Sequence, residues 1–564
     1  MDEPVKQGHP AGRFWLSAYP PNVPPEIPPL EYDSVAEMIV ASCRRFSDRP
    51  AFTCMGATLA YEGLDRMSAY FAGWLKSRGL GAGDRVAVMM PNVLQYPVAV
   101  AGVLRAGMVV VNVNPLYTAR ELEHQLRDSG ASAIVVLENF AHTVEAVAAR
   151  GLVLEHVCVA TLGDLLGPKG AIVNLVARRL KKLVPAWSLP ASVTFRSALR
   201  HAPIERDVPV SPGDPAFLQY TGGTTGVAKG AELTNANVLS NVVQNDAWFA
   251  AVFVNRPRPE RLTYLCALPL YHVFALTVNM LMGIGHGANN VLIPNPRDIP
   301  SLVKEMARHE INVFPGLNTL FNALLAFETF ASLDFRPLFL TLAGGMAVQS
   351  SVAERWKAVT GCHVAEGYGL SETSPVVSAN RFDLTEFTGT IGLPLPSTEI
   401  DIRDDDGHSL PCGEVGEICV RGPQVMKGYW NRPDETAKVM TADGFFRTGD
   451  MGLMDEAGYT RIVDRKKDMI LVSGFNVYPN EIEEVVSAHD GVREVAAIGI
   501  PDERSGEAVK LFVVRRDPAL TEEDILAYCK ANLTNYKRPR GIEFCEDLPK
   551  SPVGKILRKD LRAL

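Results

Sequence analysis

Residues 220–230, Tyr-Thr-Gly-Gly-Thr-Thr-Gly-Val-Ala-Lys-Gly, combine residue types that bind phosphate. Glycines lack the Cβ atoms that would keep a backbone away from a phosphate, and successive N–H groups in such a turn form an anion-binding concavity. Threonine hydroxyls suit phosphate oxygens or Mg²⁺, and the lysine adds a positive charge. We therefore predict a nucleotide-phosphate loop that binds through Thr221, Gly222, Gly223, Thr224, Thr225, Gly226 and Lys229.

The spacing distinguishes this loop from the commoner nucleotide-binding motifs. In a Walker A loop the lysine directly follows the last glycine, whereas two residues separate Gly226 from Lys229 here. The glycines at 222, 223 and 226 do not match G-x-G-x-x-G either. A flexible surface loop is the alternative, but three threonines, a lysine and a preceding apolar run favour phosphate binding.

Five further blocks follow along the chain: 268–274 (LPLYHVF), 367–373 (GYGLSET), 446–450 (FRTGD), 464–468 (DRKKD) and 552–556 (PVGKI). Together with the phosphate loop, and in this order, they resemble the motifs of the acyl-adenylate-forming enzymes. That superfamily includes acyl-CoA synthetases, luciferases and the adenylation domains of peptide synthetases. The blocks are most similar to those of bacterial long-chain fatty acid–CoA ligases, and the resemblance runs from about residue 112 to the C-terminus.

The resemblance implies ATP-dependent activation of a long-chain fatty acid to acyl-CoA through an acyl-adenylate, with release of AMP and pyrophosphate. A carboxylate does not react with a thiol, because its leaving group would be oxide, and adenylation replaces that oxide with AMP. The first step gathers negative charge around one phosphorus, so cations and N–H dipoles are needed there. The expected substrates are a fatty acid, ATP and CoA, and the expected cofactor is Mg²⁺.

The resemblance also assigns catalytic roles to residues in these blocks. Lys555 would reach from a small C-terminal domain onto the carboxylate and α-phosphate oxygens. Glu372 and the Thr221 hydroxyl would contact Mg²⁺, which takes few protein ligands. His272 would position the carboxylate rather than act as a general base. Without the resemblance, Lys555 would be interpreted as a solubilising surface charge and His272 as a core histidine.

Further residues are assigned to nucleotide and CoA binding by the same resemblance. The ring of Tyr368 is expected to stack on adenine, Asp450 to accept from the ribose hydroxyls, and Arg465 to reach the ribose or phosphate. After rotation about a hinge at Lys467, a second face would offer CoA its binding residues. The remaining nucleotide contacts are Gly344, Gly345, Gly367, Gly369 and Thr373, and the CoA contacts are Ser473, Gly474 and Phe475.

Bulk properties limit the classes of protein that the chain can belong to. Its 564 residues exceed the size of one hydrophobic core, so at least two domains are expected. A net charge of −8 does not favour nucleic acid, which binds basic surfaces. Nine scattered cysteines without a C-x-x-C motif argue for a reducing compartment. The start lacks the order of a signal peptide, and no apolar run reaches the ~20 residues of a spanning helix, so we expect a cytoplasmic enzyme.

The hydrophobic pattern predicts an α/β fold. Short β-branched runs at 84–90, 109–113 and 133–137 alternate with helical patterns such as 120–129, which is typical of βαβ units and parallel sheets. We predict an N-terminal AMP-binding domain over 1–464, with a β-rich subdomain at about 398–463. A mobile α+β C-terminal domain is predicted over 465–564, with the hinge at 465–467.

Residues 169–186 have the pattern of an amphipathic helix. Apolar residues fall on one helical face, and Arg178, Lys181 and Lys182 fall on the other. This suits a helix that lies on the anionic inner face of a membrane. The alternative is an ordinary helix packed on its own domain. A homodimer is also left open by the sequence.

Other functions stay open at this point. They are activation of a medium-chain or aryl acid, acyl transfer to a carrier protein, oxidation of the adenylate as in luciferase, and, from another class, a nucleotide-dependent membrane-associated binding protein without acyl chemistry. The segment 314–325 has the composition of an acyl-tunnel wall or of a core helix. Acyl chain length therefore cannot be predicted from it.

Overall fold

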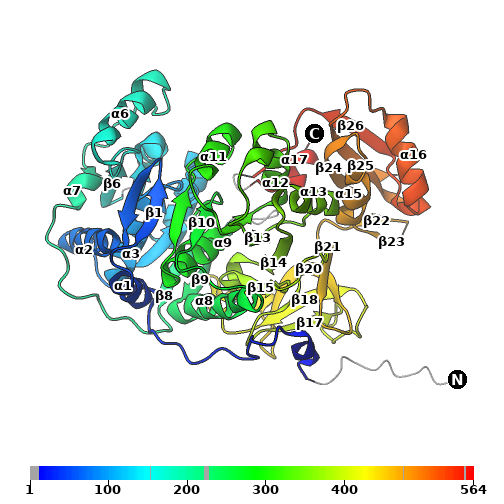
Figure 1. Cartoon of the computed structure of the whole chain (residues 1–564), viewed down its shortest axis with the longest axis horizontal. Helices are drawn as coiled ribbons and strands as arrows, with labels where there is room; N and C mark the ends of the chain where they lie inside the picture. The colour runs from blue at the N-terminus through cyan, green and yellow to red at the C-terminus, as the bar shows by residue number, and fades with distance from the viewer. Residues whose placement is uncertain are drawn as a thin grey trace.

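The computed structural model describes residues 12–152, 154–221, 228–473, 475–502, 504–551 and 554–563. In these residues the strands form four sheets, of eight, nine, four and five strands, with helices packed between and around them (Figure 1). The two largest sheets are mainly parallel, and a small α+β unit closes the chain. The predicted α/β fold with a small C-terminal domain is confirmed.

The first sheet carries both ends of the predicted phosphate loop. Its parallel centre is Val109–Asn112 (β4), Arg85–Met89 (β3), Ala133–Leu137 (β5) and His156–Ala160 (β6). These strands are buried and rich in β-branched residues, as the sequence predicted. Pro215–Thr221 (β8) joins the sheet beside β4 and pairs antiparallel with Lys229–Thr234 (β9). The edges are Gly428–Tyr429 (β19) and Val193–Thr194 (β7).

The second sheet brings several sequence blocks to one edge. Its parallel strands are Pro50–Cys54 (β1), Asn289–Leu292 (β11), Thr263–Cys266 (β10), Val313–Gly316 (β12), Leu340–Ala343 (β13) and Val364–Gly369 (β14). Antiparallel strands flank them: Ala57–Ala60 (β2), Val376–Ala379 (β15) and Leu393–Pro394 (β16). Parallel strands end at the same edge of a sheet, where ligands bind in α/β folds. The blocks that follow β10, β13 and β14 therefore meet there.

The main hydrophobic core includes side chains from strands of both large sheets and from the helices beside them. Gln95–Arg105 (α3) is buried along its whole length and contacts β3, β4, Val35–Arg45 (α1) and Tyr61–Ser77 (α2). Other helices are Ala119–Ser129 (α4), Ala141–Ala148 (α5), Asn235–Phe249 (α8), Ile299–Met306 (α11), Asn318–Leu325 (α12) and Ser350–Thr360 (α13). In the described residues, no helix is long and apolar enough to span a bilayer.

The C-terminal third contains the two smaller sheets. Glu399–Arg403 (β17), Gly416–Arg421 (β18), Phe446–Met454 (β20) and Thr460–Arg465 (β21) form an antiparallel sheet. The last unit has strands Ile470–Val472 (β22), Phe475–Val477 (β23), Val492–Asp502 (β24), Gly506–Arg515 (β25) and Gly541–Cys545 (β26). Its helices are Pro479–Ser487 (α15), Glu522–Asn532 (α16) and Arg558–Leu561 (α17). Short strands separated by turns in the sequence predicted the first of these units, and a succession of strand and helix patterns predicted the second.

The amphipathic segment 169–186 differs from its prediction in two ways. It is helical only as the end of a 3₁₀ turn at Lys169, the helix Gly170–Leu175 (α6) and a π-helical turn, Val176–Leu180, and residues 181–186 are not helical. Arg178 does not face outward freely, because its guanidinium lies 2.7 Å from a carboxylate oxygen of Glu138, whose side chain is 1% exposed. The segment 314–325 is likewise part strand, β12, and part helix, α12.

Candidate active site

A cleft of about 1510 Å³ lies where the two large sheets, the four-stranded sheet and the C-terminal unit meet. Strands β8, β13 and β14 end at its wall, as the rule for α/β sheets predicts. Twelve of the residues predicted from sequence line it: Thr221, Lys229, His272, Gly344, Gly345, Gly367, Tyr368, Gly369, Glu372, Asp450, Arg465 and Lys555. The predicted contacts Gly222, Gly223, Thr224, Thr225 and Gly226 lie outside the described residues.

Glu372 follows β14 in a short 3₁₀ turn and is buried in the cleft wall. Burial raises the pKa of its carboxyl, and the hydroxyl of Tyr429 opposes that shift by donating to Oε1 at 2.9 Å. Thr373 differs from the prediction. It is fully buried, and its hydroxyl bonds to the backbone of Leu370 and Pro375. Thr373 therefore holds the turn in shape rather than lining the cleft.

Tyr368, Asp450 and Arg465 form a chain of contacts across the cleft floor. The Tyr368 hydroxyl donates to Oδ2 of Asp450 at 2.7 Å, and Arg465 Nε lies 3.1 Å from Oδ1. Asp450 and Arg465 are directly opposite one another on β20 and β21. Each carboxylate oxygen can still accept a second hydrogen bond, so Asp450 remains able to accept from ribose hydroxyls. The contact with Asp450 also fixes the position of the Tyr368 hydroxyl.

Lys555 enters the cleft on a loop of the C-terminal unit. The loop is closed by Ser551, whose N–H donates to the Lys555 carbonyl at 2.7 Å and whose Oγ accepts from the Lys555 N–H at 3.1 Å. Thr319 of α12 donates to the carbonyl of Gly554 at 3.1 Å and ties the loop to the large domain. A Cβ atom on Gly345 would lie 3.1 Å from Cε and 3.5 Å from Nζ of Lys555. Gly345 therefore leaves room for the lysine.

The electrostatic surroundings of Lys555 suit an anionic ligand. Enclosure in the cleft and the charge of Arg465 lower its pKa to about 8, although Asp450 and Glu372 partly oppose that shift. Among the described residues no carboxylate forms an ion pair with its ammonium. A cation enclosed in this way, without a paired carboxylate, is stabilised strongly when an anionic ligand enters the cleft beside it.

His272 precedes a short helix, Val273–Ala275 (α9), and lines the cleft beside the ends of β10 and β13. Its Nδ1 accepts from the N–H of Phe274 at 3.4 Å. Enclosure and the positive charge of Lys555 lower its pKa to about 3, so the imidazole is neutral at physiological pH. A neutral imidazole whose Nδ1 accepts a hydrogen bond is an Nε2–H donor, which suits positioning a carboxylate.

Lys229 is engaged by the protein itself in this structure. Its ammonium lies 2.6 Å from Oε2 of Glu435 and 4.7 Å from the centre of the Tyr429 ring. Glu435 lies in the first turn of the short helix Pro433–Val439 (α14), far from Lys229 in sequence. A phosphate that binds Lys229 must therefore compete with Glu435 or share the lysine with it.

The predicted CoA-binding residues lie away from the cleft. Phe475 is 55% exposed and stacks on Tyr536, with ring centroids 4.7 Å apart. The N–H of Ser473 donates to the carbonyl of Ser505 at 2.7 Å, and the Ser473 backbone has φ +52. Gly474 lies outside the described residues, and Lys467 is exposed after β21. In this arrangement the C-terminal unit presents Lys555 to the cleft and Phe475 to solvent.

Sequence reasoning missed three side chains that shape the site: Glu366, Tyr429 and Glu435. Glu366 is buried in the cleft wall, accepts from the N–H of Val348 at 3.1 Å, and has its pKa raised by burial to about 8. Its position directly before Gly367, in a block already assigned to nucleotide binding, could have indicated that Glu366 lies at the site. Tyr429 and Glu435 belong to none of the six blocks, so their spacing gave no signal.

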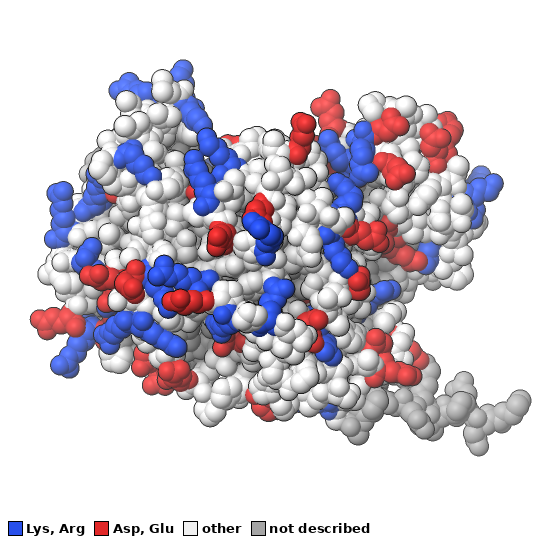
Figure 2. Space-filling view, viewed as in Figure 1, with Lys and Arg blue, Asp and Glu red and all other residues white. Residues whose placement is uncertain are grey.

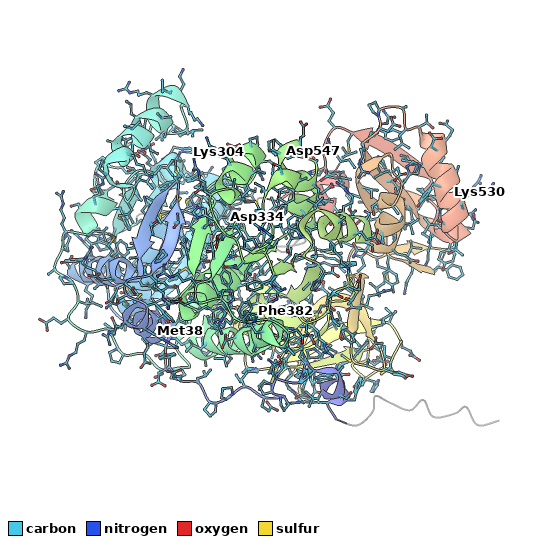
Figure 3. The ribbon with its side chains drawn as sticks, in the orientation of Figure 1. Met38, Lys304, Asp334, Phe382, Lys530 and Asp547 are labelled. Carbon is cyan, nitrogen blue, oxygen red and sulfur yellow. The ribbon has the colours of Figure 1, made fainter. Side chains whose placement is uncertain are left out.

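One side of the cleft is apolar. Phe274, Val278, Val376, Ala379 and Phe382 line it, and Figure 3 shows Phe382 below the centre of the molecule. The predicted tunnel wall 314–325 contributes only Asn318 to the lining. The apolar wall therefore comes from the segments that follow β10 and from β15 with the residues after it.

Comparison with known proteins decides the family. The family model described as AMP-binding enzyme matches residues 39–430, and the model of the AMP-binding enzyme C-terminal domain matches residues 481–555. The chain belongs to the AMP-binding enzyme family. It is 54% identical to the long-chain-fatty-acid–CoA ligase of Escherichia coli O6:H1 and 50% identical to that of Haemophilus influenzae. Each comparison covers 98% of both chains.

A solved structure shares this fold. The ATP-bound MatB of Rhodopseudomonas palustris is 30% identical to this AMP-binding enzyme and superposes with a TM-score of 0.79. The match covers 94% of this chain and 98% of MatB. The large and small units are therefore both present in a relative that binds ATP.

Proposed function

We propose that this AMP-binding enzyme is a long-chain fatty acid–CoA ligase that uses ATP, passes through an acyl-adenylate and releases AMP and pyrophosphate. Identity of 50–54% to the long-chain-fatty-acid–CoA ligases over nearly the full chain supports the overall reaction. The position of Lys555 in the cleft is the structural observation on which the mechanism depends.

In the adenylation step the fatty carboxylate attacks the α-phosphorus of ATP and pyrophosphate leaves. The Nε2–H of neutral His272 would orient the carboxylate, with the acyl chain along the apolar wall. Lys555 would neutralise the charge that develops on the oxygens around phosphorus. Tyr368 would stack on adenine, and Asp450 would accept from the ribose hydroxyls. Thr221 and Lys229, at the two ends of the phosphate loop, would bind the β- and γ-phosphates.

Glu372 and Thr221 are the residues that would hold Mg²⁺. Glu372 fits this role, because Tyr429 holds one oxygen of its buried carboxylate, and burial raises the pKa of the carboxyl, a shift that a bound cation would oppose. Mg²⁺ prefers carboxylate and hydroxyl oxygens and retains several waters. When bound, it would neutralise charge on the phosphate oxygens.

The second half-reaction requires CoA at the same adenylate. We propose that rotation about Lys467 withdraws Lys555 and brings Ser473, Gly474 and Phe475 to the cleft. The exposure of Phe475 in this structure supports the idea, since a large apolar side chain at 55% exposure lacks a packing partner on one side.

We also propose peripheral contact with a membrane through residues 169–186. The side chains of Ile172, Leu175, Leu180 and Leu183 are 51–75% exposed. They lie on a projection formed by residues 170–183, which comprise α6, the π-helical turn and the residues directly after it. Residues 165–204 contain no Asp or Glu, and Figure 2 shows only basic charges on this projection, at the upper left. The packed alternative does not account for the exposed leucines, because the core side of the segment is formed by Val173 and Ala177. A long-chain fatty acid partitions into bilayers, so a docked enzyme would meet its substrate there.

Flotation with anionic phosphatidylglycerol vesicles tests the contact. Replacing Ile172, Leu175 and Leu180 with serine should abolish flotation, whereas Val254→Ser, at an exposed apolar side chain outside the segment, should not. Arg178 should be left intact, because it pairs with Glu138. Unchanged flotation of the triple variant refutes the contact. The homodimer stays a prediction, and analytical ultracentrifugation would measure the oligomeric state.

The main proposal is tested with a panel of C2 to C18 acids, ATP, Mg²⁺ and CoA. The expected products are AMP, pyrophosphate and acyl-CoA in equal amounts, with the highest kcat/KM for long chains. Formation of acyl-adenylate without consumption of CoA would instead support transfer to a carrier protein or oxidation. A preference for short or aryl acids would contradict the long-chain assignment while leaving the ligase activity in place.

A further inference from the structure

Arg558 lies three residues after Lys555 and is the centre of a buried polar cluster. Its Nη2 donates to both carboxylate oxygens of Glu483 at 2.9 Å and to Oδ1 of Asn480 at 2.5 Å. Its Nη1 donates to Oδ1 of Asp464 at 3.1 Å. One guanidinium therefore binds α15, through two of its residues, and the end of β21 at once.

The cluster is tightly enclosed and its charges depend on one another. The side chain of Arg558 is 14% exposed and that of Asp464 is 1% exposed. Burial raises the pKa of Asp464 and of Glu483, and the charge of Arg558 opposes both shifts. Separating the partners of a buried ion pair leaves an uncompensated charge, which costs free energy. Such a pair therefore favours the arrangement in which its partners are in contact.

The contacts of Arg558 divide at the proposed hinge. Asp464 belongs to β21 of the four-stranded sheet and precedes Lys467. Glu483 and Asn480 belong to α15, and Arg558 begins α17, so all three follow the hinge. A rotation about Lys467 therefore carries Arg558 and Glu483 together but separates Arg558 from Asp464.

The same loop already bears the reactive lysine. Gly554 receives the hydrogen bond of Thr319, and Lys555 enters the cleft beside Gly345. Arg558 fixes the chain on the other side of Lys555. The lysine is thus held between a contact to α12 and an ion pair to β21, both of which join the small unit to the rest of the chain in its present orientation.

We propose that Arg558 is a positioning residue for adenylation, and that its ion pair with Asp464 favours the orientation in which Lys555 lies in the cleft. This inference rests on the proposed function, because it assumes two half-reactions at one site. A contact present in only one of two states shifts their populations toward that state. Losing it should slow the step that needs Lys555 and spare the step that needs the rotated unit.

Asp464→Asn tests this with little change of volume. The variant keeps an oxygen that can accept the Asn480 N–H, which now donates to Oδ2 of Asp464 at 2.9 Å, and it leaves Arg558 bound to Glu483. Acyl-adenylate formation without CoA should fall about tenfold, in line with the loss of a hydrogen bond between charged groups. Thioester formation from supplied acyl-adenylate and CoA should change less than about twofold, because the rotated state does not use the pair.

Arg540→Gln is the matched control. Arg540 pairs with Asp502 at 2.6 Å, and both residues follow the hinge, so this ion pair moves with the small unit. Its loss should leave the ratio of the two half-reactions unchanged. Arg558→Lys is the second test variant, since lysine keeps the charge but cannot bind Asp464 and Glu483 together in the same fork geometry. It should shift the ratio in the same direction as Asp464→Asn.

Wild-type enzyme measured first separates two kinds of failure. If it forms no acyl-adenylate from any acid, the proposed function is refuted and this inference with it. If it is active but both Asp464→Asn and Arg558→Lys slow the two half-reactions equally, or slow neither, only the inference is overturned. Thermal unfolding of each variant measures whether it has lost structure generally. If misfolding were the cause of an equal loss in both half-reactions, both Arg558→Lys and Asp464→Asn would show a lowered Tm.

Discussion

Replacing Lys555 with alanine removes an ammonium group from the cleft and leaves the backbone bonds of its loop in place. The loop is held by Ser551 and by the Thr319 contact to Gly554, neither of which uses the lysine side chain. The variant should therefore fold and bind ATP. Its defect should be confined to the step in which charge develops at the α-phosphorus.

The size of the defect follows from the charge and its surroundings. A unit charge about 4 Å from a phosphate oxygen contributes ~4 kcal/mol at the effective dielectric of ~20 that suits protein sites. A pKa of about 8 leaves Lys555 mostly protonated at pH 7, so nearly all of this interaction is available. Removing one preorganised charge donor typically lowers kcat by ~10²–10³, which is the loss we expect for adenylation.

The assay measures the two half-reactions separately. Adenylation is followed as labelled acyl-adenylate in the absence of CoA, and thioester formation as acyl-CoA from supplied acyl-adenylate. Lys530→Ala is the control, because Lys530 is an exposed lysine of α16 on the outer side of the small unit (Figure 3). Full-rate adenylation by Lys555→Ala, with an acid that the wild type uses, refutes the role assigned to the lysine.

The same residue predicts a pH dependence. The lowered pKa of Lys555 means that its positive form is present below about pH 8 and is lost as the pH rises through that value. The kcat/KM of adenylation should therefore fall on the alkaline side. Lys555→Arg should lose this alkaline limb, because arginine stays protonated, even if its overall rate is lower. An alkaline limb that survives in Lys555→Arg belongs to another group.

Three further predictions concern other residues of the site. Glu372→Gln should raise the Mg²⁺ concentration needed for half-maximal adenylation by at least about tenfold, because it removes a negative ligand; an unchanged Mg²⁺ titration contradicts the assignment. Glu366 has its folded pKa raised to about 8, so the native protein holds a proton that the unfolded chain releases, and stability should fall as the pH rises from about 4.5 to 8. Glu366→Gln should flatten that part of the urea-unfolding profile, and a profile as steep as that of the wild type would assign the effect elsewhere. Lys467→Pro restricts the hinge backbone and should slow thioester formation more than adenylation, whereas equal losses would argue against a hinge at this position.

The sequence by itself determined the local elements and the chemistry of the blocks. Strands such as 133–137 and helices such as Pro479–Ser487 follow from apolar runs and helical periodicity, which act between near neighbours. The sequence also identified Lys555, Glu372 and Asp450, because each lies within a short block of specific residue types. The resemblance then supplied roles that spacing alone left open.

Only the tertiary structure decided which side chains meet. Lys229 and Glu435 are 206 residues apart, and nothing in their spacing indicates the ion pair between them. The exposure of Leu180 and the ion pair of Arg178 with Glu138 likewise depend on how residues 170–183 pack on the rest of the protein. A helical pattern predicts which side chains share a face of the helix, but it does not predict what that face contacts. The ion pair of Arg558 with Asp464 joins residues 94 apart in the sequence, from two different units of the fold. Sheet order and domain docking are set by long-range packing, and a pattern of near neighbours contains no information about that packing.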